Sequence, residues 1–249
     1  MALNTDRRYV SMGGSAADAA EVDAGLRSHM LRVYNLMASG LVLSGIVALL
    51  IDTVPAIQSL FYVTVDGQVA GMTLLGMIGM WSPLIILFGA MFMMRSASAA
   101  ATQGLYWLFV TLQGIGLSIL LQVYTDASVV RVFFITAAAF AALSLYGYTT
   151  KRSLSGMGSF LIMGVFGLVI AMIVNLFLQS TMLQFVISGI GVLVFSGLIA
   201  YDTQRIKEEY SASLDDQTLS KSATWAALSL YINFINLLQF LLFFLGNRE

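Results

Sequence analysis

The sequence predicts an all-α, polytopic membrane protein, a bundle of seven transmembrane helices. Of its 249 residues, 59% are hydrophobic and only 10% are charged, whereas about 25% of the residues in a soluble domain are charged. The mean hydropathy of +0.87 points to the same class. Seven apolar windows reach the length of about 20 residues that a spanning helix needs; they cover residues 33–53, 72–94, 105–123, 129–148, 160–178, 182–200 and 224–245.

The chain divides into a short polar segment and one membrane domain. Residues 1–29 carry mixed charges and are expected to be mobile, and residues 30–249 hold the seven windows. A secretory signal peptide would place a basic start directly before an apolar core, and residues 1–29 do not. The first window is therefore expected to act as its own insertion signal.

The connections between windows differ in length. Only a few residues around 179–181 join the fifth and sixth windows, which predicts a tight antiparallel pair. Residues 52–71 form the longest connection on the outer side, and FYVTVDGQV within them alternates loosely. Residues 205–223, of mixed charge, form the largest inner connection and are interpreted as a solvated loop.

Lysine and arginine placement predicts the orientation, because cytoplasmic connections are enriched in positive charge. A cytoplasmic N-terminus puts ten of the basic residues inside and two outside. The inner ones are Arg7, Arg8, Arg27, Arg32, Arg95, Lys151, Arg152, Arg205, Lys207 and Lys221, and the outer ones are Arg131 and Arg248. We therefore expect an odd number of spans and a C-terminus on the far side.

Several function classes lack the residues they require. The net charge of −1 and the lack of a basic run with interleaved aromatics exclude a nucleic-acid partner, and no cysteine is present. A retinal protein needs a lysine in its last span, where none occurs, and a rhomboid protease needs a membrane histidine, whereas the sole histidine, His29, precedes the first span. AYD at 200–202 resembles one motif of an intramembrane aspartyl protease, but the second acid is missing. We expect no enzymatic activity.

Polar side chains inside the windows are the candidate functional residues, because polar groups at membrane depth are costly. Asn233 and Asn236 share a helical face, and Ser229 lies one turn earlier on it. This stripe must face protein or water, so it either forms interhelical hydrogen bonds or lines a pathway. Asp202 lies just after the sixth window, and it is either a pathway acid or the partner of Arg205 three residues later.

The motifs together resemble the bacterial branch of the Bax inhibitor-1, or transmembrane Bax-inhibitor-motif, family. The resemblance runs from about residue 30 to residue 246. It is carried by LRVYNLMASGLVLSGIVA (31–48), LSLYGYTTKRSLSGMGSFLIMG (143–164), AYDTQRIKEEY (200–210) and ALSLYINFINLLQFLLFFLG (227–246). It implies six helices around a central, rather hydrophilic seventh. It also implies a pH-responsive calcium leak channel in a bacterial inner membrane, with a cytoplasmic N-terminus and a periplasmic C-terminus.

The resemblance further implies a sensor of two aspartates, from the sixth and seventh helices, and a latch arginine on the second. These positions fall on Asp202, on Asn233 and on Arg95, which directly follows the second window. The second carboxylate is therefore replaced by an amide. We expect the Asn233 amide to donate to Asp202. The acid is then expected to stay charged near neutral pH, paired with Arg95, and the pH switch to be blunted or moved to lower pH.

The expected function is therefore a slow, pH-influenced leak of calcium or another cation. Asp202 and Asn233 would form the inner closure and a weak calcium site, and Arg95 would hold Asp202 in the closed arrangement. Asn236 and Ser229 would line the seventh helix. No cofactor is expected beyond a calcium ion. The alternative is a non-transporting membrane regulator that binds a protease or stress-response protein. The expected partners are thus the lipid bilayer, calcium or another cation, and a membrane protein.

Overall fold

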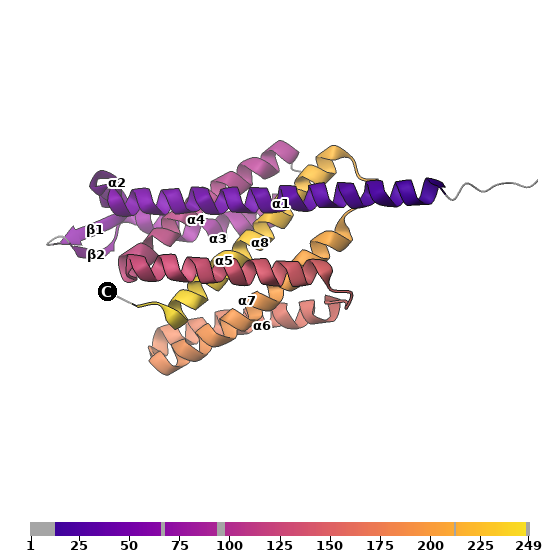
Figure 1. Cartoon of the computed structure of the whole chain (residues 1–249). Coiled ribbons are helices and arrows are strands. Elements are labelled where there is room, and N and C mark those ends of the chain that lie inside the picture. Colours follow the sequence, from indigo (N-terminus) through magenta and orange to yellow (C-terminus); the bar gives the residue numbers. More distant parts are fainter. Residues whose placement is uncertain (1–12, 66–67, 94–97, 212, 248–249) are drawn as a thin grey trace, which may run out of the picture.

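Seven long helices dominate the part of the chain that the computed structural model describes, residues 13–65, 68–93, 98–211 and 213–247 (Figure 1). They are α1 (Gly13–Thr53), α3 (Leu74–Met93), α4 (Ala99–Val123), α5 (Asp126–Thr149), α6 (Ser155–Leu178), α7 (Thr181–Glu209) and α8 (Asp216–Leu245). Each of these helices contains most or all of one of the seven predicted windows. By length and composition, six of them could cross a membrane, and α3, with 20 residues, is the second window. The predicted all-α, polytopic membrane fold is confirmed.

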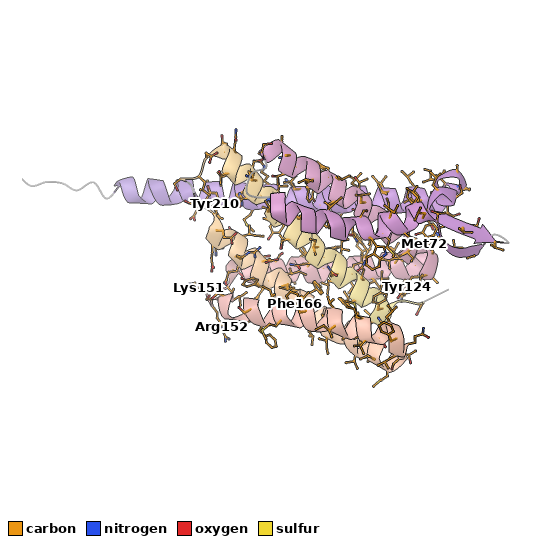
Figure 2. The ribbon with its side chains drawn as sticks, turned by 180° about the vertical axis from the view of Figure 1, so that it is seen from behind. Met72, Tyr124, Lys151, Arg152, Phe166 and Tyr210 are labelled. Atoms are coloured by element: carbon orange, nitrogen blue, oxygen red, sulfur yellow. The ribbon has the colours of Figure 1, made fainter. Side chains whose placement is uncertain are left out.

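The two termini of the described chain lie at opposite ends of the bundle, as an odd number of spans requires (Figure 1). We call the end at which α1 begins the N-terminal end and the other the C-terminal end. Lys151, Arg152 and Tyr210 lie at the N-terminal end, and Met72 and Tyr124 lie at the C-terminal end (Figure 2). Which end faces the cytoplasm stays a prediction.

Helix α1 is much longer than its apolar window. Its 41 residues span about 60 Å at 1.5 Å per residue, twice the thickness of a hydrocarbon core of about 30 Å. The helix begins twenty residues before the window. The window is shorter because hydropathy identifies only the part of a helix that lipid surrounds. Residues 1–12 lie outside the described residues, and the mobility of residues 1–29 stays a prediction.

Almost all described residues of the connection between α1 and α3 form regular secondary structure. This connection contains a short helix, α2 (Pro55–Phe61), and two antiparallel strands, β1 (Tyr62–Val65) and β2 (Gln68–Met72). The buried Tyr62 hydroxyl lies 2.7 Å from Ser118 Oγ, which fixes the hairpin to α4. Helix α2 is not predicted from the sequence, because its seven residues are too few to show a periodic pattern.

The predicted tight pair of α6 and α7 is confirmed. Gln179, between the two helices, adopts a left-handed conformation with a φ of 50°. The side chain of Asn175 accepts from the Ser180 amide at 3.0 Å and donates to Gln184 at 3.1 Å. At the other end of the bundle, Asp215 caps α8, and hydrogen bonds from the Thr218 hydroxyl and amide lower the pKa of its carboxyl.

Helix α8 is the centre of the bundle, as predicted. It packs against α1, α4, α5 and α7, and 16 of its 30 residues are buried. Helix α6, in contrast, has four buried residues of 24 and packs against α7. A lipid-facing helix exposes apolar side chains to the bilayer, so this difference in burial identifies α6 as peripheral and α8 as the core.

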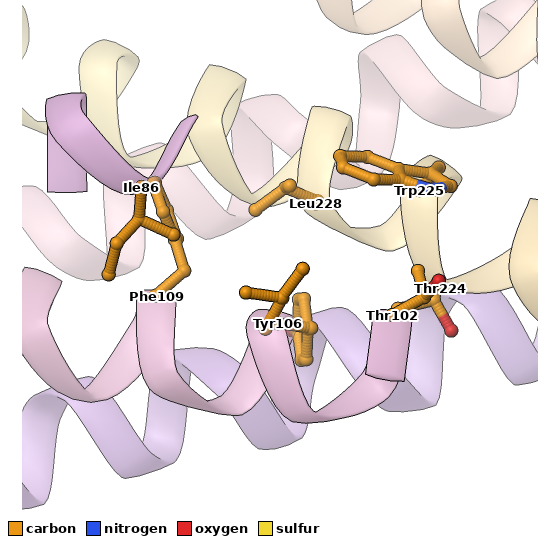
Figure 3. A pocket seen from close by; sticks show the side chains of 8 residues that line it. Ile86, Thr102, Tyr106, Phe109, Thr224, Trp225 and Leu228 are labelled. Atoms are coloured by element: carbon orange, nitrogen blue, oxygen red, sulfur yellow. The ribbon is translucent and has the colours of Figure 1, made fainter. Parts of the chain in front are cut away.

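A small cavity lies between α4 and α8, beside Ile86 of α3. It has a volume of about 10 Å³ and is lined by residues that include Ile86 of α3, Tyr106 and Phe109 of α4, and Trp225 and Leu228 of α8 (Figure 3). This volume holds about one water molecule. The cavity is therefore too small to serve as a passage for a hydrated ion.

Helices α5 and α7 approach each other at Gly147, where a Cβ atom would lie 2.2 Å from the Ala200 carbonyl oxygen. We predict that Gly147→Ala lowers the free energy of unfolding by about 1–3 kcal/mol, because α5 and α7 must separate. The melting temperature of the detergent-solubilised protein measures this. Gly167→Ala in α6 is the matched control, since nothing lies within 4 Å of its Cβ position. Equal melting temperatures for the two variants would contradict the prediction.

Candidate functional site

Asp202 joins α7 to α8. Its side chain is buried, with a residue exposure of 5%, and it lies about two turns before α7 ends at Glu209. Its Oδ2 accepts a hydrogen bond from Ser229 Oγ at 2.5 Å and another from Asn233 Nδ2 at 2.8 Å. Ser229 and Asn233 are four residues apart and therefore lie on one face of α8. The expected hydrogen bond from Asn233 to Asp202 is present, and Ser229 adds a second.

The other carboxylate oxygen faces a cation from the same helix. Asp202 Oδ1 lies 3.4 Å from Arg205 Nη2, the i+3 pair that the sequence left open. The Arg205 side chain is 41% exposed, its Nε lies 3.6 Å from Glu209, and its guanidinium lies 5.9 Å from the centre of the Tyr201 ring. Arg95, the expected latch, lies outside the described residues, so its pairing with Asp202 stays a prediction.

Asn236 does not join the Asp202 group. Its Nδ2 donates to the Ile232 carbonyl of its own helix at 2.8 Å. Ser229, Asn236 and Gln239 are all partly exposed, whereas most of the rest of this part of α8 is buried. Their spacing of seven and three residues puts them on one stripe of the helix. The apolar Ile232 lies on the same stripe and is also partly exposed, so this incompletely covered stripe of α8, which we call the polar stripe, is polar at three of four positions, with Ser229 at its Asp202 end.

A second polar group, which the sequence analysis missed, fixes the opposite face of α8. The buried Tyr231 hydroxyl lies 2.6 Å from Ser44 Oγ of α1, which also bonds the Val110 carbonyl of α4 at 2.6 Å. A serine inside an apolar window gives little signal, because its hydroxyl can bond its own helix, as Ser44 also does with Gly40 at 3.0 Å. These contacts hold α8 to α1 and α4.

A third polar group, also not predicted, lies next to Asp202. The following residue, Thr203, has its Oγ1 3.1 Å from Ser144 Oγ of α5, and both residues are fully or nearly fully buried. The Tyr34 side chain of α1 lies beside both hydroxyls. Polar contacts thus connect α1, α5 and α7 directly beside the carboxylate that bridges α7 and α8.

The donor set at Asp202 is small for a calcium site. Calcium takes six to eight oxygen ligands, and this group offers the two carboxylate oxygens, the Asn233 carbonyl oxygen and the Ser229 hydroxyl. Both carboxylate oxygens already have partners. No group of three or more histidine, cysteine or acidic residues that could hold a metal occurs among the described residues. A cation would have to displace Arg205 and the two donors from α8.

Comparison with known proteins gives a consistent result over nearly the whole chain. Residues 26–249 match the family model described as "Inhibitor of apoptosis-promoting Bax1". The chain is 52% identical to an uncharacterized protein of Caulobacter vibrioides, with 94% of this chain and 95% of the relative covered. It is 44% identical to an uncharacterized protein of Rickettsia prowazekii, covering 91% and 92%. It is also 41% identical to the inner membrane protein YbhL of Escherichia coli, covering 91% and 94%.

Proposed function

Because the chain belongs to the Bax inhibitor-1 family, we propose that it is a slow leak pathway for calcium or another cation, closed at Asp202. The observation that carries this proposal is the buried carboxylate that bridges α7 and α8. A charged group inside a membrane protein is costly and marks an ion or proton pathway by default. The proposed location is a bacterial inner membrane, which is supported by the similarity to the inner membrane protein YbhL and by the apolar spans.

The proposed closed state depends on the partners of the two Asp202 carboxylate oxygens. Ser229, Asn233 and Arg205 contact both carboxylate oxygens of Asp202 and would compete with a cation for them. Opening exchanges these partners for a cation, and α8 must then move away from α7 at this level. Hydrogen bonds to a charged group contribute about 1.5–3 kcal/mol each. The two bonds from α8 to Asp202 therefore stabilise the closed state, and the binding energy of a cation can compensate for their loss.

The proposed pathway follows the polar stripe of α8. Ser229, Asn236 and Gln239 present a hydroxyl and two amides along a partly exposed face, and oxygen atoms of this kind suit a hard cation such as calcium. Asp202 lies at one end of this stripe and would be the narrow, charge-bearing step. Asn233 would contribute its carbonyl oxygen once its amide no longer donates to the carboxylate.

The test is calcium flux into proteoliposomes that contain the purified protein and a calcium indicator. We predict flux above that of protein-free vesicles and only a shallow change between about pH 6 and pH 8, because the α8 residue that faces Asp202 is Asn233, whose amide does not titrate. A steep opening step near neutral pH would contradict the role given to Asn233. No flux at any pH would contradict the leak itself.

The second candidate, a non-transporting regulator, is favoured by one observation. Arg205 balances the charge of Asp202 within α7, so the group also suits a permanent helix–helix contact. In that case the purified protein carries no calcium, and a membrane protease or stress-response protein co-purifies with it in stoichiometric amount. Flux and co-purification measured on the same preparation separate the two functions.

A further inference from the structure

We infer that the protein binds an anionic phospholipid in a groove between α1 and α5. Two cavities follow this seam, and we call them together the α1–α5 groove. One, of about 580 Å³, is lined by residues 27–34 of α1 and 140–148 of α5. The other, of about 510 Å³, lies farther along both helices and also touches α4 and α8. Ligand sites typically have volumes of about 300–1,000 Å³.

The groove is open to the bilayer. Helices α1 and α5 run side by side over α8, with α1 packed on α4 and α8 and α5 packed on α7 and α8 (Figure 1). Several lining side chains are exposed, among them Leu145 at 63% and Phe134 at 66%. The lining is mostly apolar, so a lipid tail can enter it sideways from the surrounding bilayer.

The charged side chains at the two ends of the groove favour a lipid with an anionic headgroup. Arg27 lines it at the N-terminal end of the bundle. Lys207 of α7 lies beside the same mouth, because its Nζ donates to the carbonyl of the lining residue Tyr148 at 2.8 Å. Asp52 and Asp126 line the opposite end. An anionic headgroup is therefore favoured at the Arg27 end, where Arg27 and Lys207 outnumber Asp23 of α1, and disfavoured at the other, where Asp52 and Asp126 outnumber Arg131 of α5.

The apolar part of the groove suits the tail of that lipid. From Arg27 to Tyr34, α1 rises about 10 Å, compared with about 15 Å for one leaflet of the hydrocarbon core. The Tyr34 and Phe140 rings pack edge to face with centroids 6.5 Å apart where the first cavity ends. Tails gain little by leaving a bilayer for an apolar groove, so the headgroup contacts must provide the preference, as in basic pockets between transmembrane helices.

The groove also reaches the hydrogen bonds beside Asp202. Ser144 lines the first cavity, and its hydroxyl lies 3.1 Å from that of Thr203, the residue after Asp202. A lipid in the groove therefore lies one hydrogen bond from α7 at the level of the bridging carboxylate. Binding itself, however, does not depend on the proposed transport function.

The test is native mass spectrometry of the full-length protein titrated with dioleoylphosphatidylglycerol or dioleoylphosphatidylcholine. We expect the anionic lipid to bind about 25-fold more tightly, about fivefold for each of the two cations. Arg27→Gln with Lys207→Gln should remove this preference. The matched control is Arg131→Gln, which removes one exposed cation of α5 at the opposite end and should keep it. An equal loss in this control would overturn the proposal by showing general surface attraction.

The place of binding is tested by filling the groove. Ala141→Trp puts a bulky ring into the first cavity and should reduce lipid binding to the background level, whereas Ala142→Trp, on the next exposed position outside the lining, should bind like wild type. Leu145→Trp, at an exposed lining position, repeats the test in a variant that leaves the core untouched. Unchanged phosphatidylglycerol binding in a folded Ala141→Trp or Leu145→Trp protein, or equal binding of the two lipids to wild type, would overturn the proposal.

Discussion

Replacement of Asp202 with alanine is expected to raise the calcium leak of the reconstituted protein by about tenfold or more. The change removes the acceptor of two hydrogen bonds that join α7 to α8. Each such bond to a charged group contributes about 1.5–3 kcal/mol, and 1.4 kcal/mol corresponds to tenfold in an equilibrium constant. The buried Asn233 amide then lacks its partner, so the closed arrangement loses stability relative to the open one. Indicator-loaded proteoliposomes measure the leak directly.

Asp202→Asn separates the hydrogen bonds from the charge. The amide carbonyl can still accept from Ser229 and Asn233, and Arg205 keeps Glu209 and the Tyr201 ring as neighbours. We therefore expect this variant to leak much less than Asp202→Ala and to stay close to wild type. If both variants leaked equally, the ion pair with Arg205, and not the contact with α8, would be the closing interaction.

Replacement of Asn233 with aspartate is expected to strengthen calcium binding by about tenfold or more and to make the protein strongly pH-dependent. A second carboxylate would lie within hydrogen-bonding distance of Asp202, where 2.8 Å separates Asn233 Nδ2 from Oδ2. At an effective dielectric constant of about 20, an added charge about 4 Å from a monovalent partner is worth about 4 kcal/mol. Part of this is offset by desolvation. Isothermal titration with calcium measures the affinity.

The same variant gives a readout that does not depend on transport. At high pH the two carboxylates repel each other in the folded protein, so the native state binds a proton or a calcium ion more readily than the unfolded chain does. Its melting temperature should therefore rise as the pH is lowered or as calcium is added. Asn236→Asp is the matched control, since Asn236 bonds its own helix and does not reach Asp202. A shared response of both variants would show a general effect of charge on α8.

The fold could be predicted from the sequence because each span is a long apolar window. The windows located all seven long helices, and the resemblance gave the central position of α8. The windows could not show that α1 begins at Gly13 or that Pro55–Phe61 is helical. Hydropathy reports where lipid surrounds a helix, and it carries no information on helical residues that water surrounds.

The candidate site could be predicted in part. The contact between Asp202 and Asn233 followed from the family resemblance, because two motifs far apart in sequence had to meet. The spacing to Arg205 allowed an ion pair but could not show that it forms. The contacts of Ser144 with Thr203 and of Ser44 with Tyr231 could not be predicted. Serine, threonine and tyrosine are common in membrane helices, and only the packing of helices brings their hydroxyls together.

The close approach at Gly147 has a mechanical consequence. With its α-carbon against the Ala200 backbone, α5 is locked to α7, and the short turn at Gln179 ties α6 to the same unit. Ser44 and Tyr231 couple α1, α4 and α8 into another unit. The first unit, α5 to α7, and the second, α1 with α4 and α8, are two halves that contact each other through α7 and α8 and through α5 and α8, with Asp202 in the first of these contacts. We expect gating to be a sliding of these halves, so a cross-link between α5 and α7 leaves transport intact, whereas one between α7 and α8 arrests it.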